Sequence, residues 1–145
     1  MNDINPSPLP VGVVIVTHTD YGERLLKAAE MIIGPQDNAR TISVDVGVDT
    51  SVTVSQLDEA IRGVEKGGGV MILTDMFGGT PTNLSLSLIA QHHIEVVTGV
   101  NLPMLIKILS TRFKPLELLA ADAKNAGIQG IVVAGEILRK RVAGE

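Results

Sequence analysis

A histidine and an aspartate follow two of the most apolar runs of the sequence. His18 follows the run Val11–Thr17, and Asp75 follows the run Val70–Thr74. If both runs are neighbouring parallel strands, the imidazole and the carboxylate reach the same edge of one sheet. A carboxylate that accepts a hydrogen bond from one imidazole nitrogen fixes the tautomer and leaves the lone pair of the other nitrogen free. We therefore expect His18 and Asp75 to form a site with a nucleophilic histidine.

The residues that follow Asp75 are suited to binding an anion. Two glycines and a Thr-Pro pair lie in the stretch Met76–Pro81, and Thr-Pro is a common way to begin a helix. N–H groups at a helix start have no partner within the helix, and glycine lets an anion approach the backbone closely. The candidate phosphate-binding residues are Thr17, Gly78, Gly79 and Thr80. A histidine beside such a site can attack phosphorus and then pass the phosphoryl group on.

Other polar residues fit simpler roles. The pair His92-His93 falls in a helix-to-strand turn, at the sheet edge opposite the site, and we interpret both as surface residues. Asp45 and Asp49 follow the second predicted strand, where solvated loop charge is the simpler interpretation. Asp20 is close enough in sequence to compete with Asp75 as the partner of the histidine, but a loop position directs its carboxylate poorly.

The composition predicts one α/β domain. A chain of 145 residues buries roughly 68% of its unfolded surface, so it needs neither disulfides nor a structural metal. With 45% hydrophobic and 19% charged residues, the chain fits strands that are buried on both faces. We expect a loose N-terminal tail over residues 1–10 and a single domain over residues 11–141.

Composition and charge argue against several functional classes. The absence of cysteine rules out disulfides, thiolate nucleophiles and cysteine-ligated zinc, and it agrees with a cytoplasmic protein. A net charge of −4 and an aromatic content of 2% oppose nucleic-acid binding. No apolar run reaches the roughly 20 residues that a membrane-spanning helix needs. We expect no metal, no cofactor and no nucleic-acid partner.

Apolar runs of strand length alternate with segments of helical period, which predicts repeated βα units and a parallel sheet. The expected strands are residues 11–16, 40–46, 70–74 and 94–100, with a short fifth strand at 131–133. The expected helices are residues 22–33, a second capped near Ser51 or Thr53, a third from Thr80-Pro81, a fourth from 101, and a fifth over 115–126 that ends at Gly127. In the third helix we expect Thr80 to be the N-cap and Leu84, Leu88 and Ile89 to face inward. The run Gly67–Gly69 precedes a strand, so it is interpreted as a helix stop and not as a phosphate loop.

This order of elements favours a doubly wound sheet with strand order 2-1-3-4 and helices on both faces. In such a sheet the helices change face between strands one and three, and ligands gather outside the carboxyl ends of those two strands. His18 and Asp75 fall at these two ends. We interpret the basic segment Arg139–Arg141 as solvated charge near the end of the chain.

Three motifs spaced along the chain are more specific together than any one of them alone. They are Val-Ile-Val-Thr-His at 14–18, Leu-Thr-Asp-Met-Phe-Gly-Gly-Thr-Pro-Thr-Asn at 73–83 and Thr-Gly-Val-Asn-Leu-Pro-Met at 98–104. This pattern resembles the mannose-type (mannose–fructose–sorbose) EIIA domain of the bacterial sugar phosphotransferase system, and the likeness runs from Val11 to about Lys140. The resemblance implies that His18 accepts a phosphoryl group from phospho-HPr and gives it to an EIIB protein, that Asp75 orients His18, and that Thr80 stands at the phosphate-facing helix start.

The resemblance has further implications. It implies a cytoplasmic homodimer in which a short C-terminal strand, with Ile131–Val133 as the candidate, crosses to the sheet of the partner. An EIIB domain is often fused behind such a domain; here we expect the acceptor in trans, with membrane contact only through a transporter complex. Two positions depart from the family pattern: Thr19 stands where a glycine is common after the histidine, and Phe77 where some relatives have tryptophan.

Other functions are compatible with parts of the pattern. The phosphotransfer subunit of dihydroxyacetone kinase has the same fold and keeps the histidine, but its glycine turn differs from Phe77–Pro81. A flavodoxin-like module without enzymatic activity would bind a ligand at the same edge, although the scarcity of aromatic residues argues against a flavin. Within the resemblance, sugar transport and a regulatory role stay open. The sugar stays open as well, because an EIIA domain of this kind does not touch it.

Overall fold

A parallel four-stranded sheet forms the centre of the protein in the computed structural model, which describes residues 8–144. The strands are β1 (Gly12–His18), β2 (Ala39–Val44), β3 (Val70–Thr74) and β4 (Ile94–Thr98). Their order is β2-β1-β3-β4, which confirms the predicted topology. The register pairs Val16 with Thr74, so β1 and β3 end at the same edge of the sheet.

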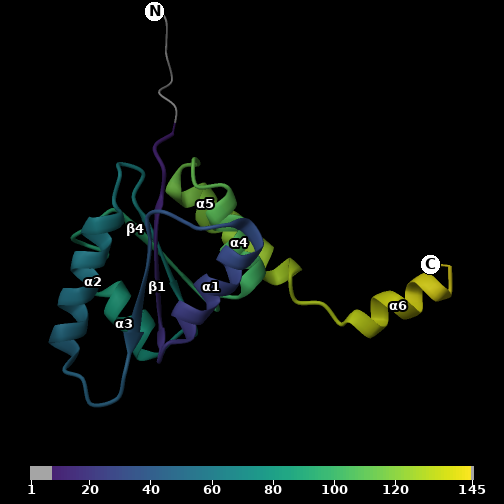
Figure 1. Cartoon of the computed structure of the whole chain (residues 1–145), viewed down its shortest axis with the longest axis horizontal. Coiled ribbons are helices and arrows are strands. Elements are labelled where there is room, and N and C mark those ends of the chain that lie inside the picture. Colours follow the sequence, from purple (N-terminus) through teal and green to yellow (C-terminus); the bar gives the residue numbers. More distant parts are fainter. Residues whose placement is uncertain (1–7, 145) are drawn as a thin grey trace, which may run out of the picture.

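Helices cover both faces of this sheet (Figure 1). They are α1 (Tyr21–Ile33), α2 (Thr50–Val64), α3 (Thr80–Leu86), α4 (Leu102–Ser110), α5 (Leu116–Gln129) and α6 (Ala134–Val142). The helices α1, α4 and α5 pack on one face, and α2 and α3 pack on the other. The helices therefore change from one face of the sheet to the other between α1 and α2, as a doubly wound sheet requires.

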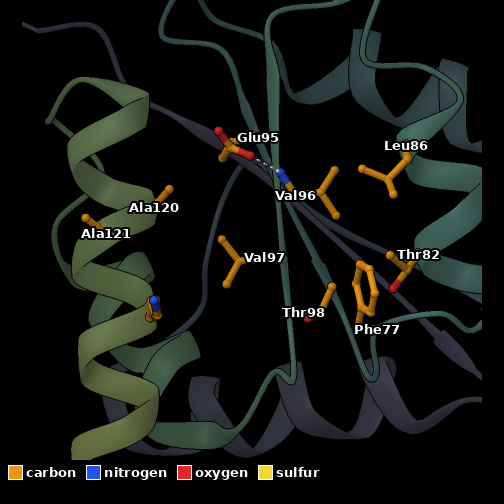
Figure 2. Close-up of a pocket in the computed structure, with 10 residues that line it drawn as sticks. Phe77, Thr82, Leu86, Glu95, Val96, Val97, Thr98, Ala120 and Ala121 are labelled. Atoms are coloured by element: carbon orange, nitrogen blue, oxygen red, sulfur yellow. Dashed lines mark hydrogen bonds between the residues drawn. The ribbon is translucent and has the colours of Figure 1, made fainter.

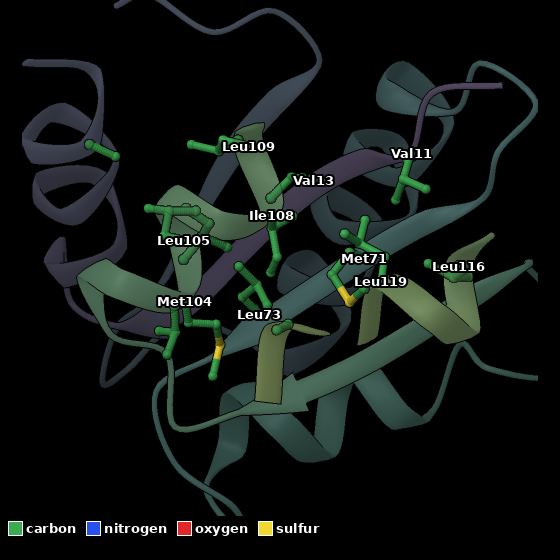
Figure 3. Close-up of a cluster of buried hydrophobic side chains, with 14 residues drawn as sticks. Val11, Val13, Met71, Leu73, Met104, Leu105, Ile108, Leu109, Leu116 and Leu119 are labelled. Atoms are coloured by element: carbon green, nitrogen blue, oxygen red, sulfur yellow. The ribbon is translucent and has the colours of Figure 1, made fainter. Parts of the chain in front are cut away.

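The two central strands are buried on both faces because alternate side chains enter two separate cores. Val13 and Ile15 of β1 pack with residues of α1, α4 and α5, as Figure 3 shows for Val13. Val14 and Val16 pack with residues of α2 on the other side. A strand buried on both faces is apolar at nearly every position and so forms a continuous hydrophobic run, which is why the sequence predicts β1 and β3.

Several predicted boundaries are wrong, and each error has a local cause. Strand β2 ends at Val44 and not at 46, because the chain turns into a loop in which Val46 is fully exposed. Helix α2 is capped by Asp49, whose carboxylate accepts from the N–H of Ser51 at 2.9 Å, so Asp49 is more than loop charge. Asp49 fits the usual preference for a short acceptor side chain at this position.

Three other elements also end elsewhere than predicted. Helix α5 runs through Gly127 to Gln129, and Gly127 packs inside the helix against the side chain of Met104. Helix α3 ends at Leu86, and Leu88 is buried from the turns that follow while Ile89 is exposed. Strand β4 ends at Thr98, before the left-handed turn at Gly99 (φ 79°).

The C-terminal part of the chain differs most from the prediction. The segment 131–133 forms no strand with the sheet, and its side chains are exposed by 77%, 52% and 62% for Ile131, Val132 and Val133. A strand needs a hydrogen-bonded neighbour, and this segment leads away from the sheet. Helix α6, which contains the segment Arg139–Arg141 that we interpret as solvated charge, follows and projects from the body (Figure 1), with none of its residues buried.

The predicted tail at residues 1–10 lies mostly outside the described residues. Of the tail residues that are described, Leu9 lies against Gly67, in the turn between α2 and β3. Across residues 8–144, no helix combines the length and apolar character needed to cross a membrane.

Candidate active site

The imidazole of His18 and the carboxylate of Asp75 are in direct contact at the carboxyl edge of the sheet. His18 is the last residue of β1 and Asp75 follows β3, so the pairing of these strands joins residues that are 57 positions apart. Nδ1 of His18 lies 2.7 Å from Oδ2 of Asp75, and the backbone N–H of His18 donates to the same oxygen at 2.9 Å. One carboxylate oxygen therefore fixes both the ring and the backbone of His18.

Asp75 is held in its ionised form. Burial raises the pKa of the Asp75 carboxyl, whose side chain is 16% exposed, but hydrogen bonds from His18 and Met76 outweigh burial and hold the pKa below its ordinary value. The contact with Met76 is a backbone N–H that donates to Oδ1 at 2.9 Å. An ionised carboxylate only accepts hydrogen bonds, so Nδ1 of His18 carries the hydrogen of their contact.

Nε2 of His18 is consequently the nitrogen with a free lone pair in the neutral ring. The His18 side chain is 48% exposed, and no residue within 8–144 forms a hydrogen bond with Nε2. A fixed ring with one nitrogen open to solvent can attack an electrophile that approaches from outside. The arrangement is that of a nucleophile with an orienting acid.

The glycine turn after Asp75 packs against this imidazole. Gly78 has a left-handed backbone (φ 81°), and a Cβ on Gly79 would lie 3.1 Å from Cε1 of His18. Gly79, and not Thr80, is the residue before the first turn of α3, and no side chain caps this helix. The predicted capping role of Thr80 is wrong, and its hydroxyl is left at an exposed position at the helix start.

Thr17 does not join this cluster. Its hydroxyl is fully buried, accepts a hydrogen bond from the N–H of Gly22 at 2.8 Å and donates to the carbonyl of Thr19 at 3.3 Å. Thr17 therefore holds the start of α1 against the loop after His18. Thr19 itself has a left-handed backbone (φ 53°), which gives a physical reason for a glycine at this position.

Asp20 is not the partner of the histidine. Its carboxylate lies 3.3 Å from Nε of Arg24, one turn further along α1, in an exposed pair. Asp75, and not Asp20, is therefore the hydrogen-bond partner of His18. Asp75 follows the end of β3 next to His18, whereas Asp20 lies at the start of α1, which leads away from the imidazole.

Sequence reasoning missed two buried hydroxyls next to the site. Oγ1 of Thr74 and Oγ1 of Thr82 are 2.6 Å apart, and Thr82 also donates to the carbonyl of Met76 at 2.7 Å. Threonine at the end of a strand and in the first turn of a helix is common, so neither residue stood out in the sequence. Only the fold reveals that the two side chains meet beneath the Asp75 turn.

A second histidine–aspartate contact lies at the opposite edge of the sheet. Nε2 of His92 is 2.6 Å from Oδ1 of Asp58 on α2, and the His92 side chain is only 13% exposed. The interpretation of His92 as a surface residue is therefore wrong, while His93 is exposed as predicted. Asp58 also pairs with Arg62, and these two contacts hold the pKa of the Asp58 carboxyl below its ordinary value. This cluster ties α2 to the turn before β4.

A groove of about 490 Å³ runs along β4, the edge strand of the sheet (Figure 2). Helix α5 and helix α3 form its two walls, and Phe77 lies at one end. Its lining residues are Phe77, Thr82, Leu86, Glu95, Val96, Val97, Thr98, Ala120, Ala121 and Lys124. The groove is mainly apolar and lies next to a strand edge with no neighbour in the described chain.

Comparison with known protein families gives one match over most of the chain. The family model described as "PTS system fructose IIA component" matches residues 12–125, a range that includes His18, Asp75 and the glycine turn.

Similar proteins carry related names. The chain is 31% identical over 129 residues to the PTS system mannose-specific EIIAB component of Escherichia coli (strain K12), covering 85% of this chain and 40% of that protein. It is 30% identical over 132 residues to the PTS system fructose-specific EIIA component of Bacillus subtilis (strain 168), covering 90% of each. The chain thus spans well under half the length of the mannose-specific relative.

Solved structures show the same fold. Phosphotransferase system component EIIA from Streptococcus agalactiae superposes with a TM-score of 0.80 at 26% identity, over 87% of this chain and 98% of that one. A mannose/sorbose specific IIA subunit from Enterococcus faecalis gives a TM-score of 0.79 at 23% identity, over 86% and 94%.

Proposed function

The chain belongs to the mannose/fructose/sorbose family of EIIA components of the sugar phosphotransferase system, and from this membership we propose that His18 carries a phosphoryl group between two other proteins. Phospho-HPr is the donor, and an EIIB protein, acting in trans, is the acceptor. We place this relay in the cytoplasm, with a membrane reached only through a transporter complex. The observation that carries the proposal is the contact of 2.7 Å between Nδ1 of His18 and Asp75, which leaves Nε2 free.

The proposed first step transfers phosphorus from one nitrogen to another. The lone pair of His18 Nε2 forms a bond to phosphorus, the N–P bond of phospho-HPr breaks, and its electron pair returns to the histidine of HPr. The hydrogen on Nδ1 of His18 stays in its contact with Asp75, whose negative charge offsets the positive charge that develops on the ring. In the second step a nucleophile of EIIB attacks the same phosphorus, and the N–P bond to His18 breaks.

The phosphoryl oxygens need hydrogen-bond donors near Nε2. Gly78, Gly79 and Thr80 are the proposed donors, through their N–H groups and the Thr80 hydroxyl. The packing of Gly79 against the imidazole supports this assignment, because it places the turn next to the reacting ring. Helix α3 has only seven residues, so individual N–H groups matter more here than the dipole of a long helix. Thr17 is assigned a supporting role, since its hydroxyl is already used at the start of α1.

We also propose that the protein is a homodimer in which the C-terminal segment of each chain lies on its partner. The segment 131–133 is extended and exposed, and α6 has no buried residue although Ile137, Leu138 and Val142 are apolar. The apolar groove beside β4 offers an unpaired strand edge for such a segment (Figure 2). Covering both surfaces at once would remove an exposed apolar segment and an open sheet edge.

The decisive experiment is phosphorylation with purified components. Incubation with phosphoenolpyruvate, EI and HPr is expected to add one acid-labile phosphate per chain, which His18→Ala abolishes. A double variant, His92→Ala with His93→Ala, is the control and is expected to keep the label. Label that survives His18→Ala, or no label on the unaltered protein, would contradict the proposal.

A further inference from the structure

Two buried threonine hydroxyls form a chain of hydrogen bonds under the turn that carries Asp75. Thr82 donates to the carbonyl oxygen of Met76 at 2.7 Å, and the hydroxyls of Thr74 and Thr82 are 2.6 Å apart. Since Thr82 has a single hydroxyl hydrogen and uses it on Met76, the hydrogen between the two threonines belongs to Thr74. The direction of the chain is therefore Thr74 to Thr82 to the Met76 carbonyl.

These hydrogen bonds restrain the backbone on both sides of Asp75. Thr74 directly precedes Asp75 and Met76 directly follows it, so the two neighbours of the carboxylate are tied to one side chain of α3. The N–H of Met76 in turn donates to Asp75 Oδ1. Thr74 and Thr82 are 0% and 1% exposed, so water does not compete for these contacts.

We propose that Thr82 is a positioning residue for phosphoryl transfer, acting through the Met76 carbonyl and Thr74 to hold the Asp75 carboxylate against Nδ1 of His18. The inference rests on the proposed function of His18 and adds a residue to it. Within residues 8–144 the Thr82 hydroxyl forms hydrogen bonds with Thr74 and Met76 and none with the imidazole, so its effect passes through the turn. A rotation of this turn would lengthen the 2.7 Å contact and release the ring from one tautomer.

The test compares three substitutions on α3. Thr82→Val keeps the shape of the side chain and removes both hydrogen bonds. Thr82→Ser keeps the hydroxyl and removes only the methyl group. Ser85→Ala is the matched control, because Ser85 is equally buried one turn further along α3 but donates to the carbonyl of Pro81, away from Asp75.

Two readouts separate positioning from general stability. Steady-state transfer from phospho-HPr is expected to show kcat about tenfold lower in Thr82→Val, with KM for phospho-HPr little changed, as for other residues that orient a reactive group. Nitrogen NMR shifts of His18 in the unphosphorylated protein are expected to show a larger share of the Nε2–H tautomer. Thr82→Ser is expected to restore both values, and Ser85→Ala to leave both as in the unaltered protein.

Several outcomes would overturn the inference. A folded Thr82→Val protein with unaltered kcat and tautomer overturns it, as does a Ser85→Ala protein with an equal loss. If Thr82→Val does not fold, Thr74→Val decides: it is expected to give a smaller change of the same two readouts, and unaltered values count against the inference. The tautomer is measured without any transfer, so absence of phosphorylation on the unaltered protein contradicts the proposed function and leaves this test standing.

Discussion

At the scale of single residues, a small number of atoms fixes the orientation and the tautomer of His18. One oxygen of Asp75 accepts from both the backbone N–H and Nδ1 of this histidine, and the other oxygen is held by Met76. Gly79 fills the space beside Cε1, where a larger residue would press on the ring. The orientation and tautomer of the ring, and so the lone pair on Nε2, are thus set by groups that contact other atoms of His18.

The role of Asp75 in transfer is tested by removing its side chain. Asp75→Ala is expected to keep the fold and to slow phosphorylation of His18 by about 10- to 100-fold, because the ring loses its orienting partner while the nucleophile stays. The measurement is the single-turnover rate from phospho-HPr. Asp20→Ala is the control with an exposed carboxylate and is expected to retain the rate; equal rates for Asp75→Ala and the unaltered protein would refute the orienting role.

The lowered pKa of Asp75 predicts a dependence of stability on pH. Because the folded pKa lies below the ordinary value of 3.8, the unfolded chain binds more protons near that pH, and stability rises with pH there. The contribution of the Asp75 charge is expected to be complete above pH 3.8 and to be lost as pH falls through the lower folded pKa.

This dependence is measured by urea unfolding of the unaltered protein and of Asp75→Asn, which has no titrating group at 75. The difference in unfolding free energy between the two is expected to shrink as the solution is acidified below pH 3.8. A difference that stays constant through this range would show that the charge of Asp75 contributes no stability.

At the scale of elements, the loop between β1 and α1 shows strain that the family pattern avoids. Thr19 has φ 53°, in a region that costs a β-branched residue about 1–3 kcal/mol. The loop keeps this conformation because the N–H of Thr19 donates to Val44 and its carbonyl accepts from Thr17. Hydrogen bonds to neighbouring residues thus hold Thr19 in a left-handed backbone conformation that threonine does not favour by itself.

Replacing this residue with glycine is expected to stabilise the protein. Thr19→Gly removes the strain but adds freedom to the unfolded chain, so the net gain is about 1 kcal/mol. The measurement is the free energy of unfolding in urea, together with the phosphorylation rate of His18, which is expected to hold. Thr111→Gly, at a position with a negative φ (−137°), is the control and is expected to destabilise. A loss of stability in Thr19→Gly would show that the left-handed backbone is not costly here.

At the scale of the whole molecule, the apolar side chains of the two central strands are buried, whereas those of the C-terminal segment, residues 131–142, are exposed. Helices bury the central strands β1 and β3 on both faces, yet β4 has a free edge beside an apolar groove. Residues 131–133 and α6 project away from the body (Figure 1). Their apolar side chains are exposed, among them Ile131, Leu138 and Val142. A second chain that covers the segment and the groove together would bury both, which is the basis of the proposed homodimer.

The dimer is tested by placing charge in the exposed segment. The double variant Ile131→Asp with Val133→Asp is expected to shift the protein from dimer to monomer in sedimentation experiments, because a buried charge without a partner is costly. These side chains are exposed in the single chain, so its folding is expected to persist. Met31→Asp, 89% exposed on α1, is the control and is expected to stay dimeric; an unaltered protein that sediments as a monomer would refute the proposal.

The sequence alone determined the strand order, the approximate positions of most elements and the meeting of His18 and Asp75. Continuous apolar runs and helical periods are local signals, and right-handed crossovers then leave few ways to arrange them. The meeting follows from topology, since both residues end neighbouring parallel strands. None of this required knowledge of how side chains pack.

The tertiary structure decided every feature that depends on a partner from another element. It turned the Thr17 hydroxyl inward to α1, paired Thr74 with Thr82, placed the partly buried His92 against Asp58, and left residues 131–133 without a strand partner among residues 8–144. A hydroxyl or an imidazole has several possible partners, and which one it meets depends on distances set by the packing of whole elements. Sequence patterns record which face a residue occupies, whereas hydrogen-bond partners exist only once those faces have been brought together.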